Sequence, residues 1–559
     1  MKIRLEQLNP VVGDSGGNSK KILQALQKAE SNHIDLLILP EMAVTGYPAQ
    51  DLLEKEAFRN ICYKINNEII HSTGKTAILF GSLTPNKTGK GRKMFNSAIL
   101  ARNQDVLGVT HKTLLPTYDV FDDFRYFEPN NKFECLSLDD FKLGVTICED
   151  IWYNENEVQY HFYDINPAAL LKEKGADVII NISASPFTKT KHENRVGMLR
   201  NHAKKLNLPV LYVNQVGAQT DIVFDGDSMA LDRNGEIKGY TTAFEEGFTD
   251  VNLDKMNKNL ETIFVKKNQT YPDRTEERLY KAVLLGLNDY LKKTSVTNKV
   301  VIGLSGGIDS ALTTVLAAEA LGQENVTAIT LPSLFSSKGS VSDSEKLAIN
   351  LDIKLHKIEI KEIYNSFERS LASLFEGTDF GVAEENLQSR IRGDILMAYS
   401  NKFGDFLLAT GNKSEYAVGY ATLYGDMNGA LAPIGDIYKS EVFSLACWLN
   451  DLYYEEEMIP ENIIKKPPSA ELRPEQKDTD SLPEYEILDD ILYRYIELQQ
   501  SSKKISEFHK SVTVQDVIGL VDRNEFKRYQ AAPILKLTSK AFGTGRRWPI
   551  VQKWTGHEF

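Results

Sequence analysis

The chain has 559 residues, more than the roughly 250–300 residues at which a single hydrophobic core stops growing, so we expect two domains. Apolar residues make up 42% of it and charged residues 25%, which excludes a disordered, fibrous or disulfide-rich protein. Its formal net charge of -12 gives no general attraction to nucleic acid or to an anionic membrane, and no apolar run approaches the roughly 20 residues that span a bilayer.

The cysteine content indicates a reducing compartment. Only four cysteines occur in the chain, and none of them belongs to a CxxC or zinc-type pattern. The N-terminus, MKIRLEQLNPVVGD, has no long apolar segment of the kind found in signal peptides. We therefore expect a cytoplasmic protein.

The first half alternates helical patterns with short apolar runs. The spacing of apolar residues predicts a helix over 20–30. The run IDLLILP (34–40) fits a strand buried on both faces, although a buried helix has the same pattern. Similar runs lie at 76–83, 143–148, 176–183 and 209–216, and the polar segment 86–92 predicts a hairpin loop. Strands between helical stretches indicate an α/β fold.

Three reactive residues follow apolar stretches in this half. Glu41 comes directly after LLILP, Lys112 follows another apolar stretch, and Cys148 ends LGVTIC. Strand ends at one edge of a sheet commonly carry catalytic groups. Taken separately, the three have structural explanations: a helix start, a surface lysine and a small buried hydrophobe. Taken together, they suit a thiol nucleophile with a carboxylate base and an ammonium group at the oxyanion.

The sequence around this Glu–Lys–Cys set resembles the nitrilase superfamily, which hydrolyses amides through a thioester. The similar segments are LPEMAVTGYPAQDLL (39–53), LLPTYDVFDDFRYF (114–127), CEDIW (148–152), NISASPF (181–187) and YVNQVGAQTDIVFDGDS (212–228). The resemblance implies an N-terminal nitrilase-like α-β-β-α sandwich. Within the glutamine-dependent NAD synthetases this domain is the glutaminase, and the family's glutamine-binding positions fall on Tyr118, Ser185 and Lys191.

One position departs from the family pattern. Where relatives read FDExRYF, this chain has Asp123, which is shorter than glutamate by one methylene. The residue at this position can orient the lysine in the superfamily. The remaining cysteines, Cys62, Cys135 and Cys447, have no motif around them, and we interpret them as structural.

A polar segment over 253–275 predicts a linker between a first domain, 1–252, and a second, 276–559. After it the alternation starts again. A helix over 276–292 leads to a strand over 299–305, a glycine turn, a helix over 310–322, a strand over 326–333 and a helix near 341–351. This order is a βαβ unit, so we expect a doubly wound parallel sheet in the second domain as well.

The turn of this βαβ unit predicts a phosphate site. It consists of Gly303, Leu304, Ser305, Gly306, Gly307, Ile308, Asp309 and Ser310. Glycines let backbone N–H groups approach phosphate oxygens, and the following helix N-terminus adds positive partial charge. Asp309 can hold a metal that bridges phosphates. The turn is not a P-loop, because it lacks GxxxxGK[ST]. A glycine-rich turn without a ligand is the alternative.

This turn resembles the pyrophosphatase-type (PP) loop of adenylating amidotransferases, which cleave ATP between its α and β phosphates. The downstream segments 331–337, 385–393, 408–426, 433–442 and 466–485 resemble NAD synthetase, and 526–537 and 540–549 resemble its glutamine-dependent branch. The resemblance implies a PP-loop adenylation domain. Such a domain converts deamido-NAD (nicotinic acid adenine dinucleotide) to NAD with ATP, Mg²⁺ and ammonia.

The same resemblance implies the site residues of the second domain. ATP positions are the turn 303–310 with Thr410 and Lys439, and the Mg²⁺ positions are Asp309 and Glu415. The deamido-NAD positions are Asn386, Arg390, Glu415, Tyr420, Ala421, Thr422, Leu423 and Lys527. Without the motifs, Arg390 and Lys439 would be interpreted as surface charges and Asn386 as a helix cap.

Together the two halves predict a glutamine-hydrolysing NAD synthetase. We expect L-glutamine, ATP and deamido-NAD as its small-molecule partners, no nucleic acid or membrane, and a homo-oligomer. One alternative is a nitrilase-type amidase fused to another PP-loop amidotransferase, which the segments 385–393 and 466–485 disfavour. Another is a binding protein with inactive sites, which is disfavoured because Glu41, Lys112, Cys148, Asp309 and Glu415 are all intact.

Overall fold

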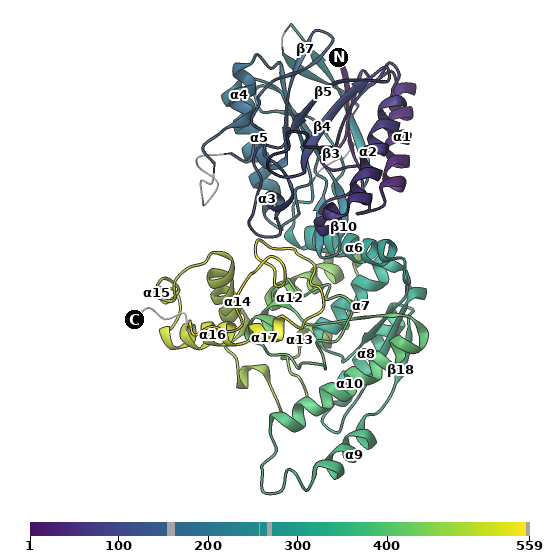
Figure 1. The fold of residues 1–559 in the computed structure, drawn as a ribbon. Helices are drawn as coiled ribbons and strands as arrows, with labels where there is room; N and C mark the ends of the chain where they lie inside the picture. The colour runs from purple at the N-terminus through teal and green to yellow at the C-terminus, as the bar shows by residue number, and fades with distance from the viewer. Residues whose placement is uncertain (154–162, 257, 265–270, 555–559) are drawn as a thin grey trace. The chain divides into compact units, whose positions relative to one another are not determined.

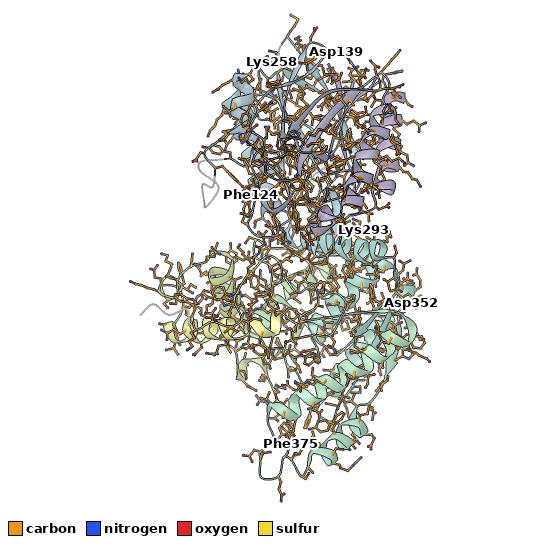
Figure 2. All side chains as sticks on the ribbon, viewed as in Figure 1. Phe124, Asp139, Lys258, Lys293, Asp352 and Phe375 are labelled. Atoms are coloured by element: carbon orange, nitrogen blue, oxygen red, sulfur yellow. The ribbon has the colours of Figure 1, made fainter. Side chains whose placement is uncertain are left out.

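The computed structural model describes residues 1–153, 163–256, 258–264 and 271–554 (Figure 1). These residues form two compact units, Met1–Asp273 and Arg274–Phe559. Apolar side chains fill the interior of each unit, while charged residues such as Asp139 and Asp352 lie on the surface (Figure 2). No helix in the described part of the chain is long and apolar enough to cross a membrane.

The first unit is built on two large sheets. In spatial order, the described strands of one sheet are β15 (Asn259–Phe264), β14 (Gly247–Asp254), β1 (Lys2–Gln7), β2 (Leu36–Ile38), β3 (Ala77–Pro85), β4 (Met94–Arg102) and β5 (Asp105–His111). Those of the other are β13 (Ile237–Tyr240), β12 (Met229–Leu231), β9 (Val210–Asn214), β8 (Val178–Ser183), β7 (Phe141–Ile147) and β6 (Leu136–Leu138). A hairpin of β10 (Val216–Gln219) and β11 (Ile222–Asp225) lies outside both sheets.

Parallel strands form the centre of each sheet. β1, β2 and β3 run parallel in the first, and β7, β8 and β9 run parallel in the second. The strands at the margins pair antiparallel. Central strands such as β8 (VIINIS) are buried along their whole length, which explains why they appear in the sequence as continuous apolar runs.

Two apolar layers hold this unit together. One lies between the sheets and includes Leu5, Ile38, Val145 and Ile180. The other packs α1 (Ser15–Ser31) and α2 (Glu56–His71) onto the first sheet. The second sheet is covered by α4 (Pro167–Glu173) and α5 (Lys191–Leu206), so the helices lie on the outer faces (Figure 1). The result is the predicted α-β-β-α sandwich.

The second unit has a parallel sheet whose described strands lie in the order β18 (Lys354–Lys357), β17 (Val326–Thr330), β16 (Val300–Gly303) and β19 (Phe406–Leu408). The helices around it are α6 (Thr275–Thr294), α7 (Ile308–Leu321), α8 (Lys338–Asn350), α9 (Lys361–Leu371), α10 (Val382–Phe403) and α12 (Lys439–Trp448). Chain order reverses between β16 and β19, which is where ligands bind in doubly wound sheets.

A second, helical core follows in this unit. It includes Tyr416, Leu488, Val517 and Ile518. Its helices are α11 (Lys413–Val418), α14 (Tyr485–Leu492), the π-helical turn η6 (Tyr493–Glu497), α15 (Ser502–Ile505), α16 (Ser511–Arg523) and α17 (Glu525–Arg528). In this core, α11 packs against α14 and α16.

The patterns in the sequence predict the main elements correctly. The runs at 34–40, 76–83, 143–148, 176–183 and 209–216 contain strands, and the helices expected in both halves are present with boundaries shifted by a few residues. The polar segment 86–92 connects β3 to β4, which pair as a hairpin. The run at 34–40 contains β2, so it forms a strand and not a buried helix.

The predicted linker over 253–275 contains a strand. Residues Asn259–Phe264 form β15, which pairs with β14 at the edge of the first sheet. Leu260 is buried there while Glu261 and Ile263 are exposed, so this edge strand has little apolar signal in the sequence. Residues 257 and 265–270 of the predicted linker lie outside the described residues.

A buried lysine anchors α11 in the second unit. The Lys413 ammonium lies 3.0 Å from Asp436 and 3.0 Å from Glu497, and it also donates to Thr538 at 2.6 Å. The Lys413 and Asp436 side chains are fully buried. Removing the cation would leave the carboxylates without their counter-charge in a desolvated position.

We expect Lys413→Met to lower the free energy of unfolding of the second unit by about 3–5 kcal/mol, because breaking a buried ion pair leaves an uncompensated charge. Urea unfolding followed by tryptophan fluorescence measures this, since Trp448, Trp548 and Trp554 all lie in that unit. Lys346→Met breaks the exposed pair with Glu457 and should cost at most ~1 kcal/mol. Equal losses for the two variants would contradict the expectation.

Candidate active sites

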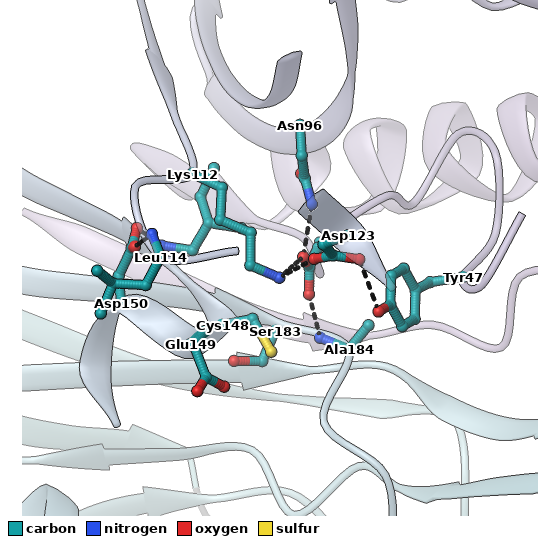
Figure 3. A network of polar contacts seen from close by, with 12 residues as sticks. Tyr47, Asn96, Lys112, Leu114, Asp123, Cys148, Glu149, Asp150, Ser183 and Ala184 are labelled. Atoms are coloured by element: carbon teal, nitrogen blue, oxygen red, sulfur yellow. Dashed lines mark hydrogen bonds and ion pairs between the residues drawn. The ribbon is translucent and has the colours of Figure 1, made fainter. Parts of the chain in front are cut away.

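The three reactive residues of the first unit meet beyond strand ends. Glu41 follows β2, Lys112 follows β5, and Cys148 follows β7 as the first residue of η2 (Cys148–Ile151), a short 3₁₀ helix. Their exposed fractions are 0%, 1% and 2%. Figure 3 shows Lys112 and Cys148 in one polar cluster. The structure therefore brings together the set that the sequence motifs suggest.

Lys112 lies between two carboxylates. Its Nζ donates to Oε1 of Glu41 at 2.8 Å and to Oδ2 of Asp123 at 2.7 Å. Burial alone would lower the pKa of Lys112, but the charges of Asp123 and Glu41 raise that pKa well above its ordinary value. The ammonium group therefore stays protonated at any physiological pH.

Asp123, at the start of α3 (Asp123–Tyr126), reaches Lys112 despite its short side chain. Its other oxygen, Oδ1, accepts a hydrogen bond from the Tyr47 hydroxyl at 2.9 Å (Figure 3). Tyr47 is itself buried. The aspartate is thus held on both oxygens, and the missing methylene does not break the contact with the lysine.

Cys148 sits at a sharp bend. Its φ of 47° lies in the left-handed region, which a residue with a side chain adopts at a cost. Burial raises the pKa of the thiol far above its ordinary value, Glu41 raises it further, and Lys112 opposes the shift. The thiol is therefore protonated at neutral pH in this structure, and its activation requires a base.

Further contacts orient Glu41, and sequence reasoning missed them. Asn96 in β4 donates to Glu41 Oε1 at 2.6 Å, and the backbone N–H of Ala184 donates to Oε2 at 2.8 Å. Asn96 interrupts an apolar strand, MFNSAIL, and this buried polar residue was the available signal. Glu149, directly after Cys148, was missed as well.

Two of the three positions expected to bind glutamine, Tyr118 and Lys191, lie near Glu149. The Tyr118 hydroxyl donates to the two oxygens of Glu149 at 2.9 and 3.0 Å. Lys191 begins α5 with its Nζ 5.2 Å from the ring centre of Trp152, and burial together with Arg195 lowers the pKa of Lys191 to about 8. Ser185 is buried beyond β8, where its backbone N–H donates to Asn214 at 2.8 Å.

The turn at 303–310 of the second unit joins β16 to α7. Gly306 has a φ of 78°, and a Cβ atom there would lie 2.2 Å from the carbonyl oxygen of Ser340, so no side chain fits. The Ser305 hydroxyl accepts from the N–H of Gly307 at 3.2 Å. A cavity of about 290 Å³ lies against this turn, and Thr410, Glu415, Tyr420 and Lys439 also line it.

Two carboxylates in this cavity share a cation. The Lys439 ammonium contacts Asp309 and lies 3.4 Å from Glu415. Asn412 donates to the other oxygen of Asp309 at 2.9 Å. Burial raises the pKa of Glu415 to about 8, with Lys439 opposing and Asp309 adding to the shift. Lys439, which would read as a surface charge without its motif, is therefore buried in the site.

The pair Asp309 and Glu415 has the donor chemistry that Mg²⁺ requires. Both supply hard carboxylate oxygens and already converge on a positive charge. No group of three or more metal-binding side chains occurs among the residues that the structure describes. Magnesium usually takes only one or two carboxylates and completes its shell with phosphate oxygens and water, so the residues fit.

The positions expected to bind deamido-NAD interlock. Asn386, inside α10 and not at its cap, accepts from the Thr422 hydroxyl at 2.8 Å. Arg390 donates to the carbonyl of Leu423 at 3.2 Å, and Lys527 in α17 donates to the carbonyls of Gly419 and Ala421 at 2.7 and 2.8 Å. The structure thus brings α10, the segment 419–423 and α17 to one place.

Comparisons with known proteins match both units. Residues 2–258 match the family model of carbon-nitrogen hydrolases, and residues 279–531 match that of NAD synthases. The nitrilase-like and doubly wound predictions are therefore confirmed.

Whole-length relatives share one description. A glutamine-dependent NAD(+) synthetase of a Synechocystis species is 44% identical, with 98% of each chain covered, and one of Thermotoga maritima is 40% identical, with 99% of each covered. The solved glutamine-dependent NAD+ synthetase of Acinetobacter baumannii is 37% identical, with a TM-score of 0.78, 100% of this chain and 99% of that chain covered.

Cys148 should react slowly with iodoacetamide at neutral pH, because the thiolate is the reactive form and the thiol pKa is raised. We expect its alkylation rate, measured on the Cys148 peptide by mass spectrometry, to keep rising beyond the roughly 8.5 pKa of an ordinary thiol. Glu41→Gln removes a charge that raises this pKa and should move the profile to lower pH. A wild-type profile that levels off at or below that ordinary pKa would contradict the assignment.

Proposed function

The chain belongs to the glutamine-dependent NAD(+) synthetases, and we propose that its first unit releases ammonia from L-glutamine while its second unit uses ATP and ammonia to convert deamido-NAD to NAD. One observation carries this division of labour. Each unit gathers its own set of reactive groups: the buried Glu41, Lys112 and Cys148 in the first, and the half-buried Asp309 and Glu415 around the buried Lys439 in the second.

In the glutaminase reaction, the Cys148 sulfur attacks the side-chain amide carbon of glutamine. Because the raised pKa keeps the thiol protonated, its proton passes to Glu41 as the sulfur–carbon bond forms. Glu41 then returns the proton to the amide nitrogen, the carbon–nitrogen bond breaks, and ammonia leaves. Water then attacks the glutamyl thioester while Glu41 takes a proton from it. The carbon–sulfur bond breaks, Glu41 returns the proton to the Cys148 sulfur, and glutamate is released.

Lys112 stabilises the oxyanion of the tetrahedral intermediate. An ammonium group has three N–H donors, and Glu41 and Asp123 accept two of them. The third remains for the substrate oxygen, and in a buried site such a donor is worth far more than in water. Tyr118, Ser185 and Lys191 bind the amino acid end of glutamine, where the Lys191 cation suits its α-carboxylate.

In the second unit, the nicotinate carboxylate of deamido-NAD attacks the α-phosphorus of ATP and pyrophosphate leaves. Ammonia then attacks the carbonyl of the acyl adenylate, and AMP leaves. The turn 303–310, Thr410 and Lys439 hold ATP, whose phosphates the backbone donors and the α7 N-terminus favour. Asn386, Arg390, Glu415, Lys527 and the segment Tyr420 to Leu423 hold the dinucleotide.

Asp309 and Glu415 are the side chains that would hold Mg²⁺. When bound, this ion neutralises charge that develops on the pyrophosphate leaving group. Lys439 balances the same two carboxylates within the chain itself. A homo-oligomer, which the family resemblance implies, and a cytoplasmic location, which the low cysteine content supports, complete the proposal.

Cys148→Ala separates the two half-reactions. We expect it to lower the glutamine-driven rate of NAD formation by at least ~1000-fold, because the nucleophile is lost, and to leave the ammonium-driven rate within about twofold. NAD formation is measured with each nitrogen source in turn. Loss of both rates from folded protein, or a wild type that makes no NAD from either source, would overturn the proposal.

Asp309→Asn is the opposite test. It removes one of the two carboxylates from the ATP site, so we expect NAD formation from both glutamine and ammonium to fall by roughly 100-fold or more. Glutamate release from glutamine, measured with all substrates present, should persist because the first unit is unchanged. If NAD formation continues at the wild-type rate, Asp309 has no role in adenylation.

A further inference from the structure

A fourth acidic residue, besides Glu41, Asp123 and Glu149, lies next to the glutaminase site, and among the described residues its hydrogen bonds go to backbone N–H groups and not to Lys112. Asp150 stands two residues after Cys148, within η2, and its exposed fraction is 2%. Its Oδ1 accepts backbone hydrogen bonds from Thr113 at 3.0 Å and Leu114 at 2.8 Å, and its Oδ2 accepts one from Ile147 at 3.0 Å. Figure 3 shows Asp150 beside Leu114.

These donors flank the two residues that act on the substrate carbonyl. Thr113 and Leu114 directly follow Lys112, whereas Ile147 directly precedes Cys148. The lysine segment continues from β5 of one sheet, and the cysteine segment continues from β7 of the other. One carboxylate therefore joins the chain segments that carry the nucleophile and the oxyanion donor, across the boundary between the sheets.

We propose that Asp150 is a positioning residue of the glutaminase reaction, which sets the place of Cys148 relative to Lys112. The inference rests on the proposed function of this unit. Asp150 touches neither the substrate nor the reacting atoms. It acts by fixing two backbone segments, and a misplacement of about 1 Å in such a site can lower a rate by roughly 100-fold.

The bend at Cys148 explains why this support is needed. A residue with φ of 47° keeps that conformation only where its surroundings impose it. The bond from Ile147 to Asp150 closes the turn on which the cysteine stands. On the other side, the bonds from Thr113 and Leu114 hold the backbone just beyond Lys112, whose ammonium is already held by Glu41 and Asp123.

The contacts also require a carboxylate at position 150. Both of its oxygens accept, so that three donors are satisfied by one side chain. An asparagine of the same size has one acceptor oxygen, and its NH₂ group would face a backbone N–H. Burial raises the pKa of Asp150 to about 7, and the bonds from Ile147 and Leu114 oppose that shift.

Asp150→Asn tests the proposal in the full-length protein. We expect kcat for glutamine hydrolysis to fall by roughly 100-fold with KM for glutamine changed less than about threefold, because positioning of the reacting groups is lost and glutamine binding is not. Ammonium-driven NAD formation should stay within about twofold of wild type, since the second unit is untouched.

Asp232→Asn is the matched control. Asp232 is also buried in the first unit and its carboxylate accepts backbone bonds from Asn234 and Glu236, but it lies in the connection between β12 and β13. The same chemical change there should leave kcat within about twofold. If Asp150→Asn fails to fold, as judged by circular dichroism, Asp150→Ser replaces it, because serine is smaller and keeps one acceptor.

The outcomes separate this inference from the proposed function. A wild type without glutaminase activity overturns the proposed function itself. An active wild type whose folded Asp150 variant keeps its kcat overturns the positioning role, as does a variant that raises KM alone. An equal loss of kcat in the Asp232 control also overturns it, since the effect would then reflect general damage to the unit.

Discussion

The first unit depends on one buried cation placed between two buried carboxylates. Lys112, Glu41 and Asp123 are all almost completely removed from water, and each charge is tolerable only because the others are within hydrogen-bonding distance. Asn96, Ala184 and Tyr47 satisfy further lone pairs of the two acids. Well-packed apolar residues would often be at least as stable in such a place, so the charges are explained by chemistry and not by stability.

The second unit repeats the arrangement with different consequences. Lys439 lies between Asp309 and Glu415 in the cavity. A second lysine, Lys413, belongs to the same helix as Glu415, and it lies between Asp436 and Glu497. The first lysine balances two acids that line the cavity beside the turn 303–310. The second is fully enclosed and fixes the helix that carries Glu415.

Features that depend on neighbouring residues in the chain can be predicted from the sequence, whereas contacts between distant residues cannot. The parallel strands and their helices could be predicted because burial on both faces leaves continuous apolar runs in the sequence. The reactive residues could be predicted because short motifs surround them. The edge strand β15 could not, since Leu260 is the one buried residue in its stretch Asn259–Ile263. The hydrogen bond between Tyr47 and Asp123 joins residues 76 positions apart, and no local pattern records such a contact. Asp150 was visible in CEDIW, but its three donors come from β7 and from the segment after β5, which are far apart in the sequence.

The left-handed backbone at Cys148 also limits which nucleophile this fold can present. At positive φ a branched β-carbon meets the neighbouring carbonyl groups more severely than an unbranched one, so threonine would be a strong outlier where cysteine is tolerated. Serine has the right shape but a far less acidic hydroxyl, and the two carboxylates that contact Lys112, Glu41 and Asp123, are both already engaged with its ammonium group. The bend thus restricts this strand end to residues with an unbranched β-carbon, such as cysteine and serine.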